Sequence, residues 1–423
     1  MDYTEARAYL AALQPGGMKM GLERMQRVLQ RLGEPQRQLR VVHIAGTNGK
    51  GSTARMLQAI LTAAGYRTGL YASPSVTGLR DTITIDNTPI SRADFAACVT
   101  AAAEQQPWMG EAGSLSEFEC ITAAALLYFA RQHTDIVVLE CGMGGRDDAT
   151  NVLEAPLAAV LTPIALDHAA WLGGTVAEIA ANKCGIFRPH CTVVTSPAQD
   201  EDALGVIFEQ AAAAGLMVRI PNAAAAPVVH DELGTVAFTY GGETYTLPLT
   251  GAFQRDNALT ALETIAVLRE KCFTVDAAAQ QAGLAAVSMP CRQEVFSREP
   301  LILLDGAHNP HGIAALADTL TRHLAGVPLT AVIGMLRDKD TAACAARLAP
   351  LCTHMVCCTP DNPRALAAEA LAAQMTPFCT DVRTADTPEQ ALALARSLAG
   401  TQPLLIAGSF TVAAPLRRIL SEE

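Results

Sequence analysis

Several common sequence signals are scarce or missing in this chain of 423 residues. Basic residues are few: 31 Lys plus Arg stand against 42 Asp plus Glu, which gives a formal charge of −11. Phosphate contacts need an excess of Lys and Arg, so this balance disfavours nonspecific binding of nucleic acid and leaves only a local basic patch open. The 12 cysteines form no Cys-x-x-Cys pair and no Cys/His cluster with zinc spacing, so we expect reduced, buried thiols.

Long apolar runs and a leader-like start are also missing. The longest apolar stretches, such as residues 121–130, are shorter than a helix needs to cross a membrane. The first ten residues carry Asp2 and Glu5 and show no basic stretch followed by an apolar block, so no signal peptide is expected. These absences predict a cytoplasmic protein with no membrane partner.

What the chain does contain is typical of a compact fold. Half of the residues are apolar, 17% are charged, and the 31 glycines and 23 prolines are spread along the sequence. This composition excludes a disordered chain. The length is sufficient for two or three domains.

Short β-rich apolar runs alternate with helical stretches, which predicts an α/β protein with a largely parallel sheet. Between residues 228 and 249 the pattern changes to short alternating strands around Gly241-Gly242, which predicts an antiparallel flap at the edge of the first domain. In the first half, strands are predicted at 40–45, 136–140, 158–162 and 192–195, and helices at 51–64, 118–133 and 175–184.

A second alternation begins at Leu301 and predicts a smaller Rossmann-like α/β domain. The segment 288–292 interrupts a helical stretch and contains a proline, so we place the domain junction there. The predicted division is a first domain at 1–290, a linker at 291–297 and a C-terminal domain at 298–423. Its strands are predicted at 301–304, 330–333, 355–358 and 404–406, and two of its helices at 312–323 and 388–398.

The run Gly46-Thr47-Asn48-Gly49-Lys50-Gly51-Ser52 follows a β-rich segment and precedes a helical one, as a phosphate-binding loop requires. Glycines let backbone N–H groups approach phosphate oxygens, the helix N-terminus adds a positive dipole, and Lys50 can reach the β- and γ-phosphates. The general pattern G-x-x-x-x-G-K-[ST] is not met, because position 44 is Ile44 and Gly51 separates Lys50 from Ser52. A glycine-rich turn that only caps a helix is the alternative. The strand, loop, lysine and hydroxyl together favour a site for a nucleoside triphosphate.

A second glycine-rich segment, residues 141–151, follows a predicted strand that ends in Glu140. This strand places a carboxylate at the carboxyl edge of the sheet, where open α/β folds bind ligands. Carboxylate oxygens suit Mg²⁺, which usually bridges protein and nucleotide phosphate. Alone, the segment could be a simple strand-ending turn. Beside the phosphate loop, we interpret it as part of a site.

Two further polar groups have both a functional and a structural interpretation. His168 follows another predicted strand, so it is either a metal ligand or a hydrogen-bonded structural histidine. Lys183 ends a helical stretch, where a positive charge is favourable to the helix dipole. From the residues alone, the dipole is the simpler explanation of Lys183.

In the second half, the run Asp305-Gly306-Ala307-His308-Asn309-Pro310 joins an apolar strand to a helix. We expect Asp305 and His308 at the carboxyl edge of this second sheet, facing a ligand held between domains. The alternative is that Asp305 caps the following helix.

Together these motifs resemble the folylpolyglutamate synthase / dihydrofolate synthase family, a branch of the Mur-ligase-like ATP-dependent amide ligases. The resemblance runs from Gly21 to Phe410 and implies a P-loop-type central domain and a C-terminal glutamate-ligase domain. Seven motifs in family order carry it. They are Gly46 to Ser52, Ser73-Pro74, Glu140 to Asn151, Leu166-Asp167-His168, Lys183 to Phe187, Asp256-Asn257-Ala258 and Asp305 to Pro310.

The resemblance implies a role for each matching position. The loop at 46–52 holds ATP phosphates and supplies the catalytic Lys50, and Lys183 matches a catalytic lysine that the family carries as a carbamate. Ser73, Glu140 and His168 match ligands of magnesium, with two ions expected. The other implied positions are Asn257, Arg292 and Asp305 for the nucleotide, Phe118, Asp147, Asp148 and Ala149 for the pterin, and Ser409 with the catalytic His308 for the incoming glutamate.

Several positions depart from the family pattern. None of them changes the phosphate or metal chemistry, but they alter the loop expected near the pterin and so bear on substrate preference. They are Ser75 in place of His, Asp81-Thr82 in place of Glu-Arg, Asn182 in place of Glu, Cys184 in place of Ala, Phe253 in place of His and Cys291 in place of Gly.

The activity that the resemblance implies is ATP-dependent ligation of L-glutamate to dihydropteroate, to reduced folates or to both, through an acyl phosphate. The partners are then small molecules, and we expect a monomer that binds no nucleic acid. A bifunctional enzyme is favoured, with a folylpolyglutamate synthase alone as the alternative.

Two other functions fit the sequence less well. A cell-wall Mur ligase carries a substantial domain ahead of the loop, whereas only 45 residues precede Gly46 here. A non-catalytic ATP-binding regulator would not need the metal and carbamate positions together, yet Glu140, His168 and Lys183 are all present.

Overall fold

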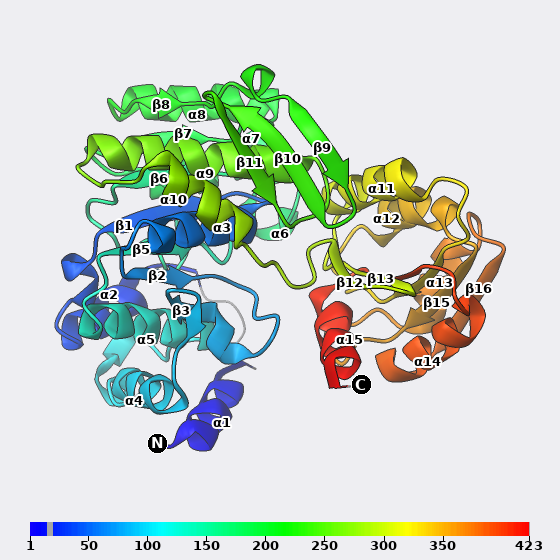
Figure 1. The fold of residues 1–423 in the computed structure, drawn as a ribbon. Helices are drawn as coiled ribbons and strands as arrows, with labels where there is room; N and C mark the ends of the chain where they lie inside the picture. Colours follow the sequence, from blue (N-terminus) through cyan, green and yellow to red (C-terminus); the bar gives the residue numbers. More distant parts are fainter. Residues whose placement is uncertain (15–19, 423) are drawn as a thin grey trace. The chain divides into compact units, whose positions relative to one another are not determined.

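The computed structural model describes residues 1–14 and 20–422, which form two compact units (Figure 1). Unit 1 contains Met1–Ala226 and Asp256–Ala286, apart from the undescribed residues 15–19. Unit 2 contains Pro227–Arg255 and the chain from Val287 onward. Each unit is described separately below.

Unit 1 is built on an eight-stranded sheet with the order β4-β3-β2-β5-β1-β6-β7-β8. Six neighbouring strands, β2, β5, β1, β6, β7 and β8, run parallel to one another. Strands β3 and β4 add an antiparallel edge beside β2. The bounds are β1 Val41–Ala45, β2 Thr68–Tyr71, β3 Ile83–Ile85, β4 Thr88–Pro89, β5 Ile136–Glu140, β6 Ala158–Leu161, β7 Thr192–Thr195 and β8 Val218–Arg219.

Helices cover both faces of this sheet, which explains why every residue of β1, β2, β5 and β6 is buried (Figure 1). Val137 and Leu139 of β5 join one core with side chains of α2, α4 and α5, while α3 and α10 pack together on the opposite face. The helices are α1 Tyr3–Leu13, α2 Glu23–Arg31, α3 Lys50–Ala63, α4 Arg92–Ala103, α5 Glu117–Arg131, α6 Ala169–Leu172, α7 Val176–Lys183, α8 Glu201–Ala213, α9 Phe253–Glu270 and α10 Ala277–Ala285.

Helix α3 begins differently from its neighbours. Helices α5 and α7 start with capping boxes, in which Ser116 and Thr175 accept from the backbone and Glu119 and Glu178 reach back. The N-cap of α3 is instead Gly49, with φ 83° and no side-chain cap. The amide groups of its first turn are therefore not occupied by a capping side chain, and an anion can accept hydrogen bonds from them.

Unit 2 contains two sheets. The larger has six strands in the order β12-β13-β17-β14-β15-β16, in which only the β12–β13 pair is antiparallel. Its strands are β12 Glu294–Arg298, β13 Leu301–Leu304, β14 Thr330–Ile333, β15 His354–Cys358, β16 Asp381–Ala385 and β17 Leu404–Ala407, and the helices are α11 Pro310–Leu324, α12 Thr341–Leu348, α13 Ala368–Met375, α14 Pro388–Ala399 and α15 Phe410–Glu422.

The smaller sheet is the antiparallel flap, formed by β9 (Val228–Glu232), β10 (Thr235–Tyr240) and β11 (Glu243–Leu247). We expected it at the edge of the first domain, but it groups with unit 2. Arg322 of α11 forms an ion pair with Asp231 at 3.2 Å, and Arg298 of β12 donates to the Leu233 carbonyl at 3.0 Å. The predicted boundaries at 290 and 298 stay a prediction.

The remaining fold predictions are confirmed. Both units are α/β, unit 1 has a mostly parallel sheet, and the predicted strands at 136–140, 192–195, 301–304 and 330–333 have the observed bounds. Eleven of the 12 cysteines are buried free thiols, and Cys272 is exposed. Across the described ranges, every helix falls short of the length and hydropathy required to traverse a bilayer.

The contact between α3 and α10 gives a stability prediction. A Cβ on Gly283 of α10 would lie 2.4 Å from the Ile60 Cα of α3, against backbone that cannot move aside. We expect Gly283→Ala to lower the free energy of unfolding by about 1–3 kcal/mol through overpacking. Gly205→Ala in α8, where nothing lies within 4 Å, is the control and should be neutral or slightly stabilising. Equal urea midpoints for the two variants would contradict this packing.

Candidate active site

The polar residues predicted in the first half lie at one edge of the unit 1 sheet. Strands β2, β5, β1 and β6 are consecutive neighbours and parallel, so their carboxyl ends meet at the same edge. Ser73 follows β2, Glu140 ends β5, the glycine-rich loop follows β1 and His168 follows β6. This is the edge at which open α/β sheets bind ligands.

The loop between β1 and α3 is held from the β6 side. The amides of Thr47 and Asn48 both donate to the Pro163 carbonyl, at 2.9 and 3.1 Å. Gly46 has φ 149°, and a Cβ there would lie 1.9 Å from the Thr162 Oγ1, so only glycine fits. Nothing in the sequence had indicated the role of Pro163, because a carbonyl can come from any residue.

Two lysine side chains meet at the carbonyl oxygen of Gly46. Lys50 Nζ donates to it at 3.0 Å and also to the Thr47 carbonyl at 3.3 Å, while Lys183 Nζ donates to it at 2.7 Å. Lys183 is only 3% exposed. Its burial, reinforced by the nearby charge of Lys50, lowers the pKa of Lys183 to about 7. Lys183 is therefore not a solvated charge at the end of α7, as the dipole explanation assumed.

Glu140 lies beside the start of α3. It is 2% exposed, and its Oε2 accepts from the Ser73 amide at 3.3 Å. A Cβ on Gly51, in the first turn of α3, would lie 3.4 Å from the same oxygen. The structure thus brings Ser73, Glu140 and the loop together, with a carboxylate next to an uncapped helix N-terminus, where the dipole favours negative charge.

His168 lies in the segment between β6 and α6, where it is the N-cap residue of α6 with φ 52°. Its Nε2 is 3.9 Å from Asp167 Oδ2, and its side chain is about one-third exposed. Asp167 raises the pKa of Lys183 through its charge, a smaller effect than burial, which places this segment near the two lysines. In the described part of the chain, no three His, Cys, Asp or Glu side chains gather as a metal cluster. A magnesium ion here would draw its remaining ligands from hydroxyls, phosphates and water.

Asn257 contacts the loop directly. It is 4% exposed on α9, and a Cβ on Gly49 would lie 2.4 Å from its Oδ1. Gly49 also has φ 83°, so glycine is needed here for two independent reasons. The predicted nucleotide position in α9 is thus adjacent to the phosphate loop.

The glycine-rich segment after β5 packs against two elements. The Phe118 ring of α5 covers Gly142, where a Cβ would lie 2.5 Å from its Cζ. Asn182, which stands where the family has glutamate, accepts from the Gly145 amide through Oδ1 at 3.0 Å and from the Arg146 amide at 2.9 Å through its carbonyl. This departure therefore retains an acceptor for the turn.

A buried polar network supports the same segment. Asp148 accepts from the Met143 amide, the Thr150 amide and the Thr150 hydroxyl, at 2.7, 3.0 and 2.6 Å. Thr150 Oγ1 also lies 2.8 Å from the Nε2 of His43 on β1. Burial lowers the pKa of His43 to about 3, so the imidazole is neutral. Asp148, a predicted pterin contact, thus uses both oxygens within the loop. Among the described residues, no such bond involves the side chain of Asp147, and that of Ala149 is apolar.

Sequence reasoning missed His43. A histidine within the apolar run Val41-Val42-His43-Ile44-Ala45 was the available signal, because a fully buried polar side chain needs a partner. Its nearest partner, Thr150, is 107 residues away in sequence, and Cys141 Sγ lies 3.2 Å from the same nitrogen, so only the fold reveals them.

The predicted residues of unit 2 also gather at a sheet edge, at the neighbouring ends of β13 and β17. Asp305 follows β13 and accepts from the amides of Gln293 and Ala307, at 2.8 and 2.6 Å. Ser409 follows β17, and the guanidinium of Arg292 lies 4.4 Å above the Phe410 ring. His308 Nδ1 lies 2.9 Å from the Gly306 carbonyl.

Asp305 is not a helix cap. The N-cap of α11 is Asn309, whose side chain accepts from the Gly312 amide at 2.8 Å. Asp305 is 5% exposed, and desolvation raises its pKa to about 6, against the opposing effect of its hydrogen bond from Ala307 and the charge of Arg292. The two amide hydrogen bonds hold the Asp305 carboxyl in a fixed position at the end of β13.

Two family models match the chain. The Mur ligase middle domain matches residues 44–265, and the Mur ligase glutamate ligase domain matches residues 291–410. The chain is 36% identical to the folylpolyglutamate synthase of Lacticaseibacillus casei over 99% of each sequence. It is 33% identical to the dihydrofolate synthase/folylpolyglutamate synthase of Escherichia coli, over 98% of this chain and 94% of the relative.

Solved structures agree with these relatives. Mycobacterium tuberculosis folylpolyglutamate synthase, complexed with ADP and AMPPCP, superimposes with a TM-score of 0.90 at 32% identity, covering 100% of both chains. Escherichia coli FolC in complex with DHPP and ADP superimposes with a TM-score of 0.87 at 32% identity, covering 100% of this chain and 98% of that one.

The network under the glycine-rich segment gives a second stability prediction. Thr150→Val removes one hydroxyl and leaves Asp148 and His43 each without one buried partner. We expect a loss of about 1–3 kcal/mol in the free energy of unfolding, measured with urea. Thr264→Val is the matched control, since the Thr264 hydroxyl is buried but, in the residues that the structure describes, bonds only to the Thr260 carbonyl of its own helix. A Thr150→Val loss no larger than the control would argue against the network.

Proposed function

Since this chain belongs to the folylpolyglutamate synthase / dihydrofolate synthase family of Mur ligases, we propose that its activity is ATP-dependent ligation of L-glutamate to a folate-type carboxylate. The acceptor carboxylate attacks the γ-phosphoryl group of ATP, which gives an acyl phosphate and ADP. The amine of glutamate then attacks the acyl carbon, and phosphate leaves as the amide forms.

One observation carries this proposal: four adjacent parallel strands bring a phosphate loop, a lysine and a buried carboxylate to one sheet edge. The uncapped N-terminus of α3 supplies amide donors for phosphate oxygens. Lys50, now bonded to two loop carbonyls, is the cation that stabilises charge on the transferring phosphoryl group.

Magnesium fits the residues at this edge. Glu140, Ser73 and His168 offer oxygen and nitrogen ligands, and Glu140 is buried where a negative charge has the α3 dipole beside it. We assign these three residues to the metal, whose role when bound is to neutralise charge on the phosphates. Gly46 to Ser52 and Asn257 are assigned to the nucleotide phosphates.

The remaining proposed roles are for residues of unit 2 and for the pterin position in unit 1. Arg292 and Asp305 are assigned to the nucleotide, and His308 and Ser409 to the incoming glutamate. The support is their common position at the ends of β13 and β17, with Asp305 held by two backbone amides. Phe118, with Asp147 to Ala149, is assigned to the pterin, because the Phe118 ring already lies on the glycine-rich segment.

We favour a bifunctional enzyme that accepts both dihydropteroate and reduced folates. Relatives of both kinds match the chain: a folylpolyglutamate synthase, and bifunctional enzymes of Escherichia coli and Bacillus subtilis. A cytoplasmic location accords with the 12 free cysteines, since reducing compartments keep thiols unpaired. That the protein acts as a monomer stays a prediction.

The activity prediction is glutamate-dependent release of ADP with dihydropteroate and with tetrahydrofolate. Lys50→Met should lower kcat at least about 100-fold, because it removes a charge aimed at the phosphoryl group. Lys271→Met is the matched control, since within the described part of the chain Lys271 makes a single hydrogen bond, of 3.4 Å, to the His190 carbonyl. Turnover with tetrahydrofolate alone would show a folylpolyglutamate synthase only. Absence of glutamate-dependent ADP release with every acceptor would overturn the proposal.

We also propose that Lys183 carries a carbamate. Its neutral amine would attack CO₂, forming an N–C bond and releasing a proton, and only the neutral amine can react. Burial holds the pKa near 7, so the reactive form predominates above that pH and is lost as the pH falls below it. The buried amine lies at the phosphate loop, where an added carboxylate-like group would be close to the proposed metal.

Carbon-13 NMR with labelled bicarbonate tests the carbamate. We expect a protein-bound carbamate signal at pH 8 that weakens at pH 6, together with activity at pH 6 that bicarbonate partly restores. Lys183→Arg is the control, because arginine stays protonated and cannot take up CO₂. A wild-type spectrum at pH 8 that matches the Lys183→Arg spectrum would rule the modification out.

A further inference from the structure

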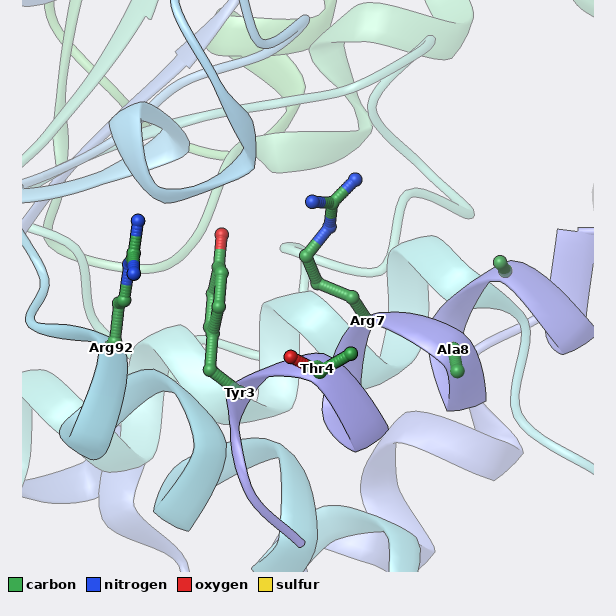
Figure 2. Close-up of a pocket in the computed structure, with 6 residues that line it drawn as sticks. Tyr3, Thr4, Arg7, Ala8 and Arg92 are labelled. Carbon is green, nitrogen blue, oxygen red and sulfur yellow. The ribbon is translucent and has the colours of Figure 1, made fainter.

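Unit 1 has a hollow of about 470 Å³ beside α1, lined by Tyr3, Arg7 and Arg92 among other residues. Figure 2 shows the side chains of these three residues extending in the same direction from α1 and from the start of α4. A second hollow, of about 240 Å³, shares all three and adds the segment 77–81. We call the two hollows together the arginine groove.

The groove is cationic in an acidic protein. Three arginines line it, Arg7, Arg80 and Arg92, and the one acidic side chain among its lining residues is Asp81. Asp81 Oδ2 already accepts from the Thr77 hydroxyl at 2.8 Å and from the Val76 amide at 3.1 Å. The lining therefore carries an excess of two positive charges in a chain whose formal charge is −11.

Two of the three arginines have a contact that orients the guanidinium group. Arg80 is held by a 2.8 Å bond from Nη1 to the Ile90 carbonyl, and the guanidinium of Arg92 lies 5.5 Å from the centre of the Tyr3 ring. Arg7 is exposed and takes part in none of the ion pairs found among the described residues. Guanidinium groups of this kind match the two oxygens of a carboxylate.

The groove lies within reach of the proposed reaction. Its wall begins at Thr77, four residues after Ser73, whose amide donates to Glu140 beside α3. Four residues span at most about 14 Å even when fully extended. An acceptor whose reacting carboxylate lies at the phosphate loop can therefore place its preceding part in the groove.

We propose that the arginine groove binds the γ-linked glutamate tail of the acceptor substrate through the free α-carboxylates of that tail. The inference rests on the proposed function. In that reaction the new amide forms at the end of the tail, so the earlier glutamates lie between the reacting group and the pterin, each with one α-carboxylate. Dihydropteroate has no such carboxylate, so the groove discriminates between the two classes of acceptor.

The sequence of the groove is consistent with a role in substrate preference. The segment 77–82 contains Asp81-Thr82 where the family pattern has Glu-Arg, so no cation stands at position 82. The cations available to a tail at this point are Arg7, Arg80 and Arg92, contributed by three separate elements.

Kinetics of Arg7→Ala and Arg7→Glu test the proposal, because Arg7 is exposed and its loss should not affect folding. We expect KM for tetrahydrofolate triglutamate to rise about three- to tenfold in Arg7→Ala and further in Arg7→Glu, with kcat retained. The ratio of kcat/KM for the triglutamate to that for dihydropteroate should fall accordingly. Arg269→Ala, which removes an exposed charge from the end of α9, is the control. An unchanged ratio in both Arg7 variants would overturn the proposal.

A binding measurement separates this inference from the proposed function. Titration of the wild-type protein with tri-γ-glutamate, which lacks a pterin, should give a calorimetric signal that weakens with salt and is reduced at least threefold in affinity by Arg7→Glu. If no acceptor is turned over but this binding is found, the proposed function fails and the groove stands. If acceptors are turned over but the Arg7 variants bind tri-γ-glutamate as the wild type does, the groove proposal fails alone.

Discussion

The carbonyl oxygen of Gly46 is the point on which the candidate site depends, because Lys50 and Lys183 both donate to it. A carbonyl oxygen has two lone pairs and can accept from both, but burial and the nearby charge of Lys50 lower the pKa of Lys183 to about 7. The carbonyl is fixed in turn by a backbone conformation that requires glycine and by the close approach of Thr162. The backbone conformation at Gly46 therefore fixes the position of both lysine side chains.

The order of the strands in the sheet brings the other candidate site residues of unit 1 to the same edge as the loop that contains Gly46. Parallel neighbours β2, β5, β1 and β6 end at one edge, so residues far apart in sequence share it. Glu140 reaches α3 there because β5 is paired with β1 in a register that sets Ile44 opposite it. Beneath the edge, Thr150 connects His43 to Asp148, so the glycine-rich segment is supported from the central strand of the sheet.

In unit 2, too, candidate site residues meet at the ends of neighbouring parallel strands. Neighbouring strands β13 and β17 bring Asp305 and Ser409 to one edge, and Asp305 accepts two backbone hydrogen bonds in a buried position. Arg292 is oriented by the Phe410 ring. A buried carboxylate and a stacked guanidinium hold fixed positions, which suits the recognition of polar substrate groups.

The sequence by itself determined the strands, the phosphate loop and the family, because these depend on local patterns: apolar runs, glycines at tight turns and a lysine at a helix start. It also placed Glu140 and Asp305 at strand ends and His168 in the segment that follows β6. Tertiary structure alone decided the burial of Lys183, the partner of His43, the grouping of the flap with unit 2 and the meeting of Arg7, Arg80 and Arg92 in one groove. Each of these depends on contacts between residues distant in sequence, and such contacts follow from how the elements pack rather than from any local pattern.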